Sequence, residues 1–433
     1  MKKLLSFLTA LLVLFACSDD REQVLKVYSW ADYIDEDLLG EFETWYEEQT
    51  GETVKVLYQT FDINETMLSK IELGHEDYDL VCPSDYIIER MLQKDLLLPI
   101  DRDFGDTPNY IDSIAPFIVN FFDQIQGSGK NANDYSVGYM WGTVGMIYNT
   151  KYVDESEVQS WNILTDPKYS GQILMKDAFR DIYTALLVYL NKDAIASGEK
   201  SMETITLDAS DESIALVENY LNSFRSSIAG WEADFGKEQM TQERAWINVS
   251  WSGDAQWAIN ETEGTDVNLK YSIPKDGSII WFDGWVIPKY ARNVKAARYF
   301  INYMCRPDNA VRNMDAIGYV SAVGGTGVLE AMKDDEFPAI DATYFFGPQA
   351  DSVCLNPVMY PDRSVIEACG MMHDTGDRTE ALMKMWSRLK GDNASYWTYI
   401  LIAVVLVGLG FAMYSRFSKK KGHHRKPASK KRR

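Results

Sequence analysis

Strand patterns alternate with helix patterns through the N-terminal part of the chain, and this alternation restricts the possible folds more than any other feature of the sequence. The expected elements are, in order, a strand at 24–28, a helix at 35–49, a strand at 53–57, a helix at 65–73, a strand at 79–82 and a helix at 86–93. Thr50 and Gly51 end the first helix, because glycine readily adopts the left-handed conformation of a helix stop. The alternation predicts an α/β fold with a mainly parallel sheet. Since ligands collect beyond the carboxyl ends of such strands, the loops at 29–33 and 83–86 could face one crevice.

The length of the chain predicts two lobes. A chain of 433 residues is too long for one ordinary core, because domains cluster at about 100–200 residues. After a polar break at 131–134, a second α/β-like stretch runs to about residue 280, with a strand at 171–176 and a helix at 183–190. A strand at 285–288 and an amphipathic helix at 295–305 follow, and the helix ends at Arg306-Pro307.

The N-terminus has the pattern of an export signal over residues 1–16. Lys2 and Lys3 form a basic start, and the apolar run at 4–15 is too short to cross a bilayer core of about 30 Å. Residues 14–17, Leu-Phe-Ala-Cys, resemble a lipobox, which predicts lipidation of Cys17 and a lipidated tether over 17–23. An ordinary cleaved signal with an incidental cysteine is the alternative.

The C-terminus has the pattern of a transmembrane helix, expected over 396–414. Residues 397–414 are uncharged and mostly aliphatic, and about 18 helical residues are just enough to cross a membrane. The basic tail at 415–433 is expected to stay cytoplasmic, which places the body outside, in the periplasm of a bacterial inner membrane. A buried core helix is the alternative.

The charge distribution argues against nucleic acid as a partner. The formal net charge of −21 includes the basic tail, so the rest of the chain is more acidic still. Such a surface repels nucleic acid and attracts cations. The basic tail is more typical of orientation and anionic lipid contact than of nucleic-acid binding.

The cysteines do not form a metal-binding pattern. Cys354 and Cys369 are the nearest candidates for a disulfide in an exported protein, whereas Cys82 and Cys305 lie in apolar patterns typical of a core. No CxxC spacing and no His-Cys cluster occurs, so we expect no metal site and no cofactor.

Aromatic residues and acids recur together near the predicted loops. Trp30 and Tyr33 flank Asp32, Tyr86 follows Ser84-Asp85, Trp251 precedes Asp254, and Trp281 precedes Asp283. Aromatic faces hold cations, and carboxylates accept charge-assisted hydrogen bonds from ammonium groups. A diammonium or triammonium alkane needs this combination, although any single pair is more often the edge of a core beside a solvated loop.

A series of segments resembles the spermidine/putrescine-binding proteins of bacterial ABC importers, in family order from about residue 24 to 320. The segments are 28–34 (YSWADYI), 64–67 (NETM), 78–84 (YDLVCPS), 138–143 (GYMWGT), 180–181 (RD), 251–254 (WSGD), 273–277 (IPKDG), 281–283 (WFD), 306–308 (RPD) and 317–319 (IGY).

The resemblance implies a two-lobed, type II periplasmic-binding fold, to which we add the C-terminal transmembrane helix. Lobe 1 is expected to comprise 24–137 and 284–345, and lobe 2 to comprise 138–283 and 346–390. A polyamine would lie between the lobes and be delivered to an ABC permease and its ATPase. The implied binding residues are Trp30, Asp32, Tyr33, Ser84, Tyr86, Asp181, Trp251, Asp254, Trp281, Asp283 and Tyr319.

The sequence departs from the family at Ala31, where relatives often have a hydroxyl, at the differently spaced segment 177–181, and at the C-terminal span. Asp254 suits a putrescine-type site, whereas Tyr86 and Trp281 suit a spermidine-type site, so the ligand length stays open.

Two alternatives to transport follow from the same residues. An enzyme is disfavoured, because the histidines are sparse and no nucleophile elbow, metal-ligand spacing or phosphate loop occurs. A sensor subunit for a polyamine or another organic cation would keep the same fold, and a neighbouring kinase gene would favour it.

Overall fold

The computed structural model describes residues 21–391 and divides the chain into two compact units, Met1–Leu382 and Met383–Arg433. The strands are β1 (Val24–Trp30), β2 (Lys55–Phe61), β3 (Leu80–Val81), β4 (Leu97–Leu98), β5 (Gln126–Gly127), β6 (Lys130–Asn131), β7 (Ser136–Asn149), β8 (Ile173–Lys176), β9 (Ile228–Glu232), β10 (Ile247–Trp251), β11 (Leu269–Ser272), β12 (Ser278–Pro288), β13 (Val320–Ser321), β14 (Ala339–Ile340), β15 (Val353–Cys354) and β16 (Cys369–Met371).

Helices connect most of these strands. They are α2 (Asp37–Thr50), α3 (Asn64–Glu72), α4 (Asp85–Gln93), α5 (Pro116–Phe122), α6 (Ala132–Tyr135), α7 (Phe179–Leu190), α8 (Lys192–Ala196), α9 (Met202–Thr206), α10 (Asp211–Phe224), α11 (Gly236–Thr241), α12 (Ser252–Glu261), α13 (Val294–Met304), α14 (Pro307–Ile317), α15 (Thr326–Met332), α16 (Thr343–Phe346), α17 (Arg363–Glu367) and α18 (Thr379–Lys390). The second unit begins inside α18.

Twelve strands of the described residues form one sheet, whose main path runs β2-β1-β3-β12-β7-β10-β8-β9. Strands β1, β2 and β3 are parallel, as are β10, β8 and β9, so each end of the path is built from strand–helix–strand units. The expectation of an α/β fold is confirmed, but the sheet is mixed and not mainly parallel, because β7 and β12 pair antiparallel with their neighbours on the main path. The strand and helix predicted first, at 24–28 and 35–49, correspond to β1 and α2.

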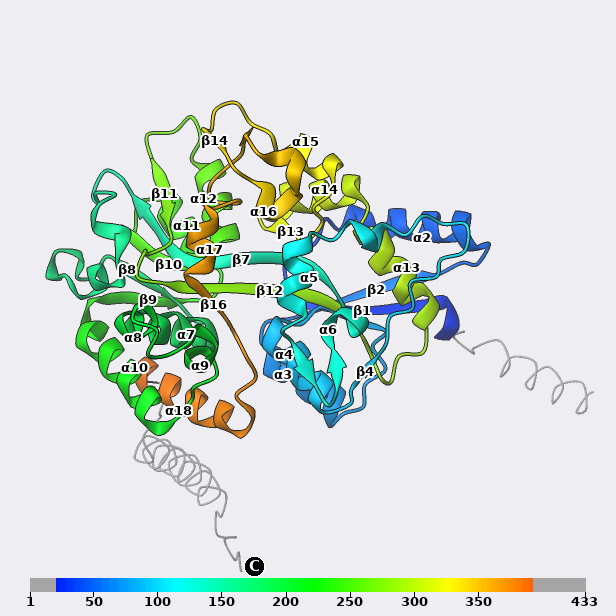
Figure 1. Cartoon of the computed structure of the whole chain (residues 1–433), viewed down its shortest axis with the longest axis horizontal. Coiled ribbons are helices and arrows are strands. Elements are labelled where there is room, and N and C mark those ends of the chain that lie inside the picture. The colour runs from blue at the N-terminus through cyan, green and yellow to red at the C-terminus, as the bar shows by residue number, and fades with distance from the viewer. Residues whose placement is uncertain (1–20, 392–433) are drawn as a thin grey trace, which may run out of the picture. The chain divides into compact units, whose positions relative to one another are not determined.

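Two long antiparallel strands, β7 and β12, connect the two parallel groups. Every residue of both strands is buried. Figure 1 shows them side by side, with β1 and β2 towards one end and β8 to β10 towards the other. The register of β12 on β7 shifts between Asp283 and Gly284, which marks a bulge in the middle of the pair. The lobe boundaries expected from the sequence stay a prediction.

The fold class needs one correction, because the predicted transmembrane helix is not part of it. No helix within residues 21–391 is long and apolar enough to cross a membrane. Helices α2 and α10 have 14 residues each, whereas a span needs about 20. The segment expected to cross, 396–414, and the basic tail at 415–433 lie outside the described residues, as do the signal sequence and Cys17.

The four described cysteines, Cys82, Cys305, Cys354 and Cys369, are free thiols. Cys354 lies in β15, which pairs with β14, and Cys369 lies in β16, which pairs with β12 in the main sheet. The candidate disulfide between them is therefore not formed.

Gly40 inside α2 and Gly51 directly after it provide a test of how this helix ends. Gly51, the residue after α2, has a φ of 72°, and an added Cβ there would meet no atom within 4 Å. We expect Gly51→Ala to lower the free energy of unfolding by about 1 kcal/mol, because alanine resists the left-handed conformation. Gly40→Ala, inside the same helix and equally unobstructed, should raise it by about 0.5–1 kcal/mol. Urea denaturation measures both changes in the free energy of unfolding. Changes of the same sign would contradict the assignment of Gly51 as the residue that ends α2.

Candidate functional site

The centre of the candidate site is the carboxyl group of Asp283, which lies on β12 at the bulge. The Tyr33 hydroxyl donates to Oδ2 of Asp283 at 2.7 Å, and the backbone of Ser84 pairs with that of Asp283. Tyr33 follows β1 and Ser84 follows β3, so the two loops expected to face one crevice do meet here. Oδ1 of Asp283 is buried without a hydrogen-bond partner. The carboxyl group is therefore only partly satisfied.

Burial raises the pKa of Asp283 to about 7, although the neighbouring Ser84 and Tyr33 hydroxyls act in the opposite direction. The nearby charge of Asp181 raises this pKa further. Burial likewise raises the pKa of Asp181, to about 6, and the indole N–H of Trp251 donates to its Oδ1 at 3.0 Å. These donors are uncharged, so within residues 21–391 no cation is hydrogen-bonded to either carboxyl, although the charges of Arg180 and Lys176 act to lower the pKa of Asp181.

Aromatic rings beside Asp283 contact one another in succession. The ring of Tyr33 contacts that of Tyr319 edge to face at 5.5 Å, and Tyr319 contacts Trp281 in the same way at 5.4 Å. Glycines make this packing possible. A Cβ on Gly253 would lie 2.3 Å from the ring of Tyr319, and a Cβ on Gly142 would lie 2.6 Å from that of Trp281.

The phenol of Tyr86 joins the same network through Asn64. The Asn64 amide donates to Ser84 Oγ at 3.0 Å and to the Tyr86 hydroxyl at 3.2 Å. That hydroxyl donates to Glu65 Oε1 at 3.1 Å. The guanidinium of Arg180 lies over the Tyr86 ring at 4.8 Å. Tyr86 is thus held in place by polar neighbours on several sides.

Asp254, at the start of α12, lies beyond Tyr319. Its Oδ1 accepts from the Tyr319 hydroxyl at 3.0 Å, and its Oδ2 accepts from the Lys176 ammonium at 2.7 Å. Lys176 also lies 4.1 Å from the ring centre of Trp251. We call the predicted residues that these contacts connect the ring–carboxylate cluster. It comprises Tyr33, Ser84, Tyr86, Asp181, Trp251, Asp254, Trp281, Asp283 and Tyr319.

Two predicted residues lie apart from this cluster. The ring of Trp30 packs on Phe61 of β2 at 4.5 Å. Asp32 is exposed and has a φ of 48°, a left-handed conformation that Asp tolerates better than most residues. The structure thus brings nine of the eleven predicted binding residues together and leaves these two outside.

Sequence reasoning missed several polar neighbours of the cluster. They are Asn64, Glu65, Asp85, Lys176, Arg180 and Glu232. Asn64, Glu65 and Arg180 lie in segments that carry the family resemblance, which was a usable signal. Lys176 ends an otherwise apolar strand pattern, where a buried lysine is hard to tell from an exposed strand end.

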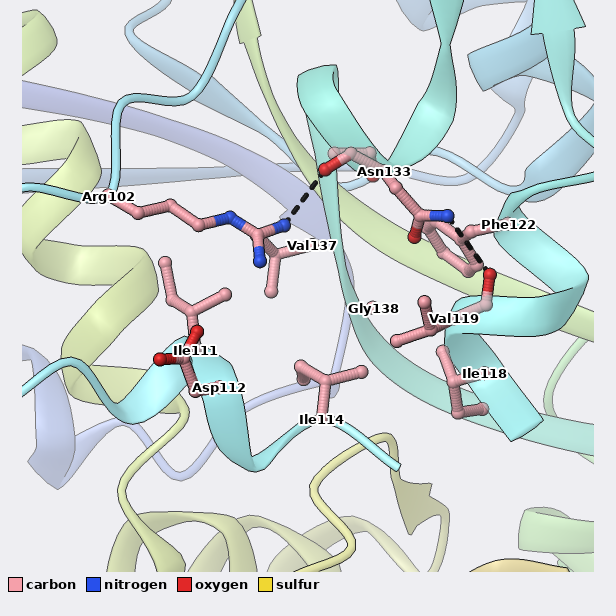
Figure 2. Close-up of a pocket in the computed structure, with 11 residues that line it drawn as sticks. Arg102, Ile111, Asp112, Ile114, Ile118, Val119, Phe122, Asn133, Val137 and Gly138 are labelled. Atoms are coloured by element: carbon pink, nitrogen blue, oxygen red, sulfur yellow. Dashed lines mark hydrogen bonds between the residues drawn. The ribbon is translucent and has the colours of Figure 1, made fainter. Parts of the chain in front are cut away.

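A cavity of about 300 Å³ lies elsewhere, between the helix α5 region and β7. Figure 2 shows Arg102 at its wall, donating to the backbone oxygen of Asn133 at 2.8 Å, with Ile114 and Ile118 on the apolar side. None of the eleven predicted binding residues lines it.

Comparisons with known proteins agree with the site's chemistry. A family model for bacterial extracellular solute-binding proteins matches residues 44–339, more than half of the chain. The spermidine/putrescine-binding periplasmic protein of Escherichia coli is 26% identical over 376 residues, which cover 87% of this chain and 94% of that protein. The putrescine-binding periplasmic protein PotF of Escherichia coli is 27% identical over 331 residues, covering 74% and 83%.

Solved structures give the same result. A putative spermidine/putrescine ABC transporter protein from Listeria monocytogenes superposes with a TM-score of 0.65 at 29% identity, covering 85% of this chain and 99% of that one. The PotD substrate-binding protein of Streptococcus pneumoniae gives 0.60 at 29% identity, with the same coverage. The resemblance predicted from the sequence motifs is confirmed, and the chain belongs to the bacterial extracellular solute-binding proteins.

Proposed function

We propose that this protein binds a polyamine at the ring–carboxylate cluster and presents it to the permease of an ABC importer. The observation that carries the proposal is the Asp283 carboxyl, which is buried beside Tyr33 with one oxygen unpartnered and no cation bound. A buried carboxylate is costly unless a cation pairs with it. An ammonium group of the ligand would supply that cation.

The rings beside Asp283 favour an alkyl ammonium over a hydrated metal ion. The rings of Tyr33, Tyr319 and Trp281 contact one another in succession, and aromatic surface attracts both cationic heads and the methylene groups that join them. The names of the relatives, which include spermidine- and putrescine-binding proteins, agree with a ligand of this kind.

Ligand entry requires movement, because the cluster is buried. Asp283 is 5% exposed and Tyr319 is 8% exposed. The cluster draws residues from the loops after β1 and β3 and from the elements after β8 and β10, which β7 and β12 connect. We propose that the two strand groups separate to admit the ligand and close when it contacts residues from both.

Titration of the purified protein with amines tests the proposal. Putrescine or spermidine should bind at least about 30-fold more tightly than butylamine, which lacks a second ammonium. Asp283→Asn should weaken that binding by about 30-fold or more, since it removes the buried partner of an ammonium. The control is Asp266→Asn, the same change on an exposed loop residue. Calorimetry that finds no polyamine binding would refute the function.

Binding should also depend on pH. A bound ammonium favours the ionised form of Asp283, whose pKa without ligand is about 7, so binding near neutrality releases a proton. Affinity should therefore rise with pH through this region and level off above it. Calorimetry in buffers of different ionisation enthalpy measures the proton release, and Asp283→Asn should reduce it. An unchanged release in the variant would assign the proton to another group.

Without ligand, the stability of the protein should fall as the pH rises. Because the pKa of Asp283 is raised above its ordinary value of 3.8 to about 7, the folded state holds more protons than the unfolded state between these values. This contribution to stability is lost as the pH rises through about 7. Above that pH, Asp283→Asn should raise the free energy of unfolding by about 1–4 kcal/mol. Denaturation at pH 5 and pH 8 checks this, and a variant less stable at pH 8 would contradict it.

A further inference from the structure

Lys176 places a cation of the protein's own inside the ring–carboxylate cluster. It is the last residue of β8, a strand buried along its whole length, and it is 1% exposed. Its ammonium donates to Asp254 Oδ2 at 2.7 Å, lies 3.4 Å from Glu232 Oε1 and lies 4.1 Å from the ring centre of Trp251. One ring face and two carboxylates around an ammonium are the contacts that a ligand amine would make.

Both carboxylate oxygens of Asp254 already accept hydrogen bonds from the protein. Besides Lys176, it accepts from the Tyr319 hydroxyl at 3.0 Å and from the Ser250 hydroxyl at 3.4 Å. A second lysine, Lys237, has its ammonium 3.9 Å from Oδ1. The two acids Asp254 and Glu232 are thus balanced by two lysines.

Lys176 stays charged in this setting. Burial lowers the pKa of its ammonium, but Asp254 and Glu232 raise it, and the balance lies above the ordinary value. The lysine is therefore a permanent counter-ion of Asp254 and Glu232.

The other two carboxyls of the cluster, Asp283 and Asp181, accept hydrogen bonds only from uncharged groups, although the charges of Arg180 and Lys176 act to lower the pKa of Asp181. The nearest guanidinium, that of Arg180, donates instead to Thr375 Oγ1 at 2.9 Å and to the backbone oxygen of His373. Asp85, a further buried carboxyl beside them, has both oxygens occupied by the backbone N–H groups of Tyr86 and Phe282. Asp283 and Asp181 therefore remain as the carboxyls of the cluster to which no cation is hydrogen-bonded. Each buried ammonium requires such a partner.

We infer that Lys176 determines the specificity of the site: its tethered ammonium fills the position between Trp251 and Asp254, so that the ligand is a linear diamine that pairs with Asp283 and Asp181. A triamine would bring a third ammonium for which no further carboxyl of the ring–carboxylate cluster remains. The inference rests on the proposed polyamine binding and adds the number of ligand charges to it.

The test removes the lysine ammonium from this position together with one buried carboxylate, so that the net buried charge does not change. Lys176→Met with Glu232→Gln removes one cation and one anion and leaves Oδ2 of Asp254 without its lysine partner, while Lys237 stays near Oδ1. Lys176→Met with Asp254→Asn makes the same change in charge but removes the Asp254 carboxylate, while Asp181 and Glu232 stay in place. Both variants are made in the full chain and titrated with putrescine and spermidine alongside the wild type.

Wild-type protein should prefer putrescine. In the first variant the ratio of spermidine to putrescine affinity should rise by about tenfold or more, because Asp254 can now pair with a third ammonium. In the matched variant it should stay within about threefold of the wild-type ratio. If wild type and first variant both bind polyamines with the same ratio of spermidine to putrescine affinity, the role of Lys176 is overturned and the proposed function is not. A wild type that binds neither amine would overturn the proposed function.

A second measurement needs no polyamine. Lys176→Ala removes three methylene groups and the ammonium, which together correspond to propylammonium. If this position holds an ammonium, millimolar propylammonium should raise the unfolding temperature of the variant by at least about 2 °C more than that of the wild type. Neutral propanol is the control. Equal shifts in both proteins would show that the pocket left by Lys176 does not bind an ammonium and would overturn the inference.

Discussion

The pairing of β7 with β12 is the constraint on which the rest of the structure depends. Both strands are buried throughout, and they join the two groups of parallel strands into one sheet. The bulge between Asp283 and Gly284 lies in this pair, with ladder pairs on either side, so the Asp283 carboxyl cannot turn to solvent without breaking strand pairs. The sheet thus keeps the Asp283 carboxyl buried. This lowers the stability of the ligand-free protein, as expected of a ligand-binding site.

Much of the N-terminal sheet could be predicted because its signals are local. Alternation of polarity, helical spacing and the glycine at 51 each depend on neighbouring residues, and β1, α2 and α4 follow them closely. Strand β12 was harder, since only its end at 285–288 was predicted. Asp283 and Gly284 argue against a buried strand locally, and they are tolerated only because β7, more than a hundred residues earlier, pairs with them.

The site was predictable as far as its residues follow the ends of strands. Tyr33 and Ser84 follow parallel neighbours in the sheet, and this alone places them together at Asp283. Trp30 and Asp32 belong to the same segment but differ in conformation. Trp30 is still part of β1 and packs on Phe61, while a left-handed backbone turns Asp32 outward. Residue type and sequence position do not distinguish Trp30 from Asp32, because the direction in which each side chain points depends on the local backbone conformation.

Charge balance, rather than the number of acids, decides which ligand such a site can hold. The sequence suggests four carboxylates, Asp32, Asp181, Asp254 and Asp283, and hence a ligand of several charges. Exposure removes Asp32, and Lys176 neutralises Asp254 from within the protein. Two of these four carboxyls remain, and burial raises the pKa of both. Since an unpaired buried charge costs more than a lost surface contact, the valence of the ligand follows from the anions that the protein itself leaves uncompensated.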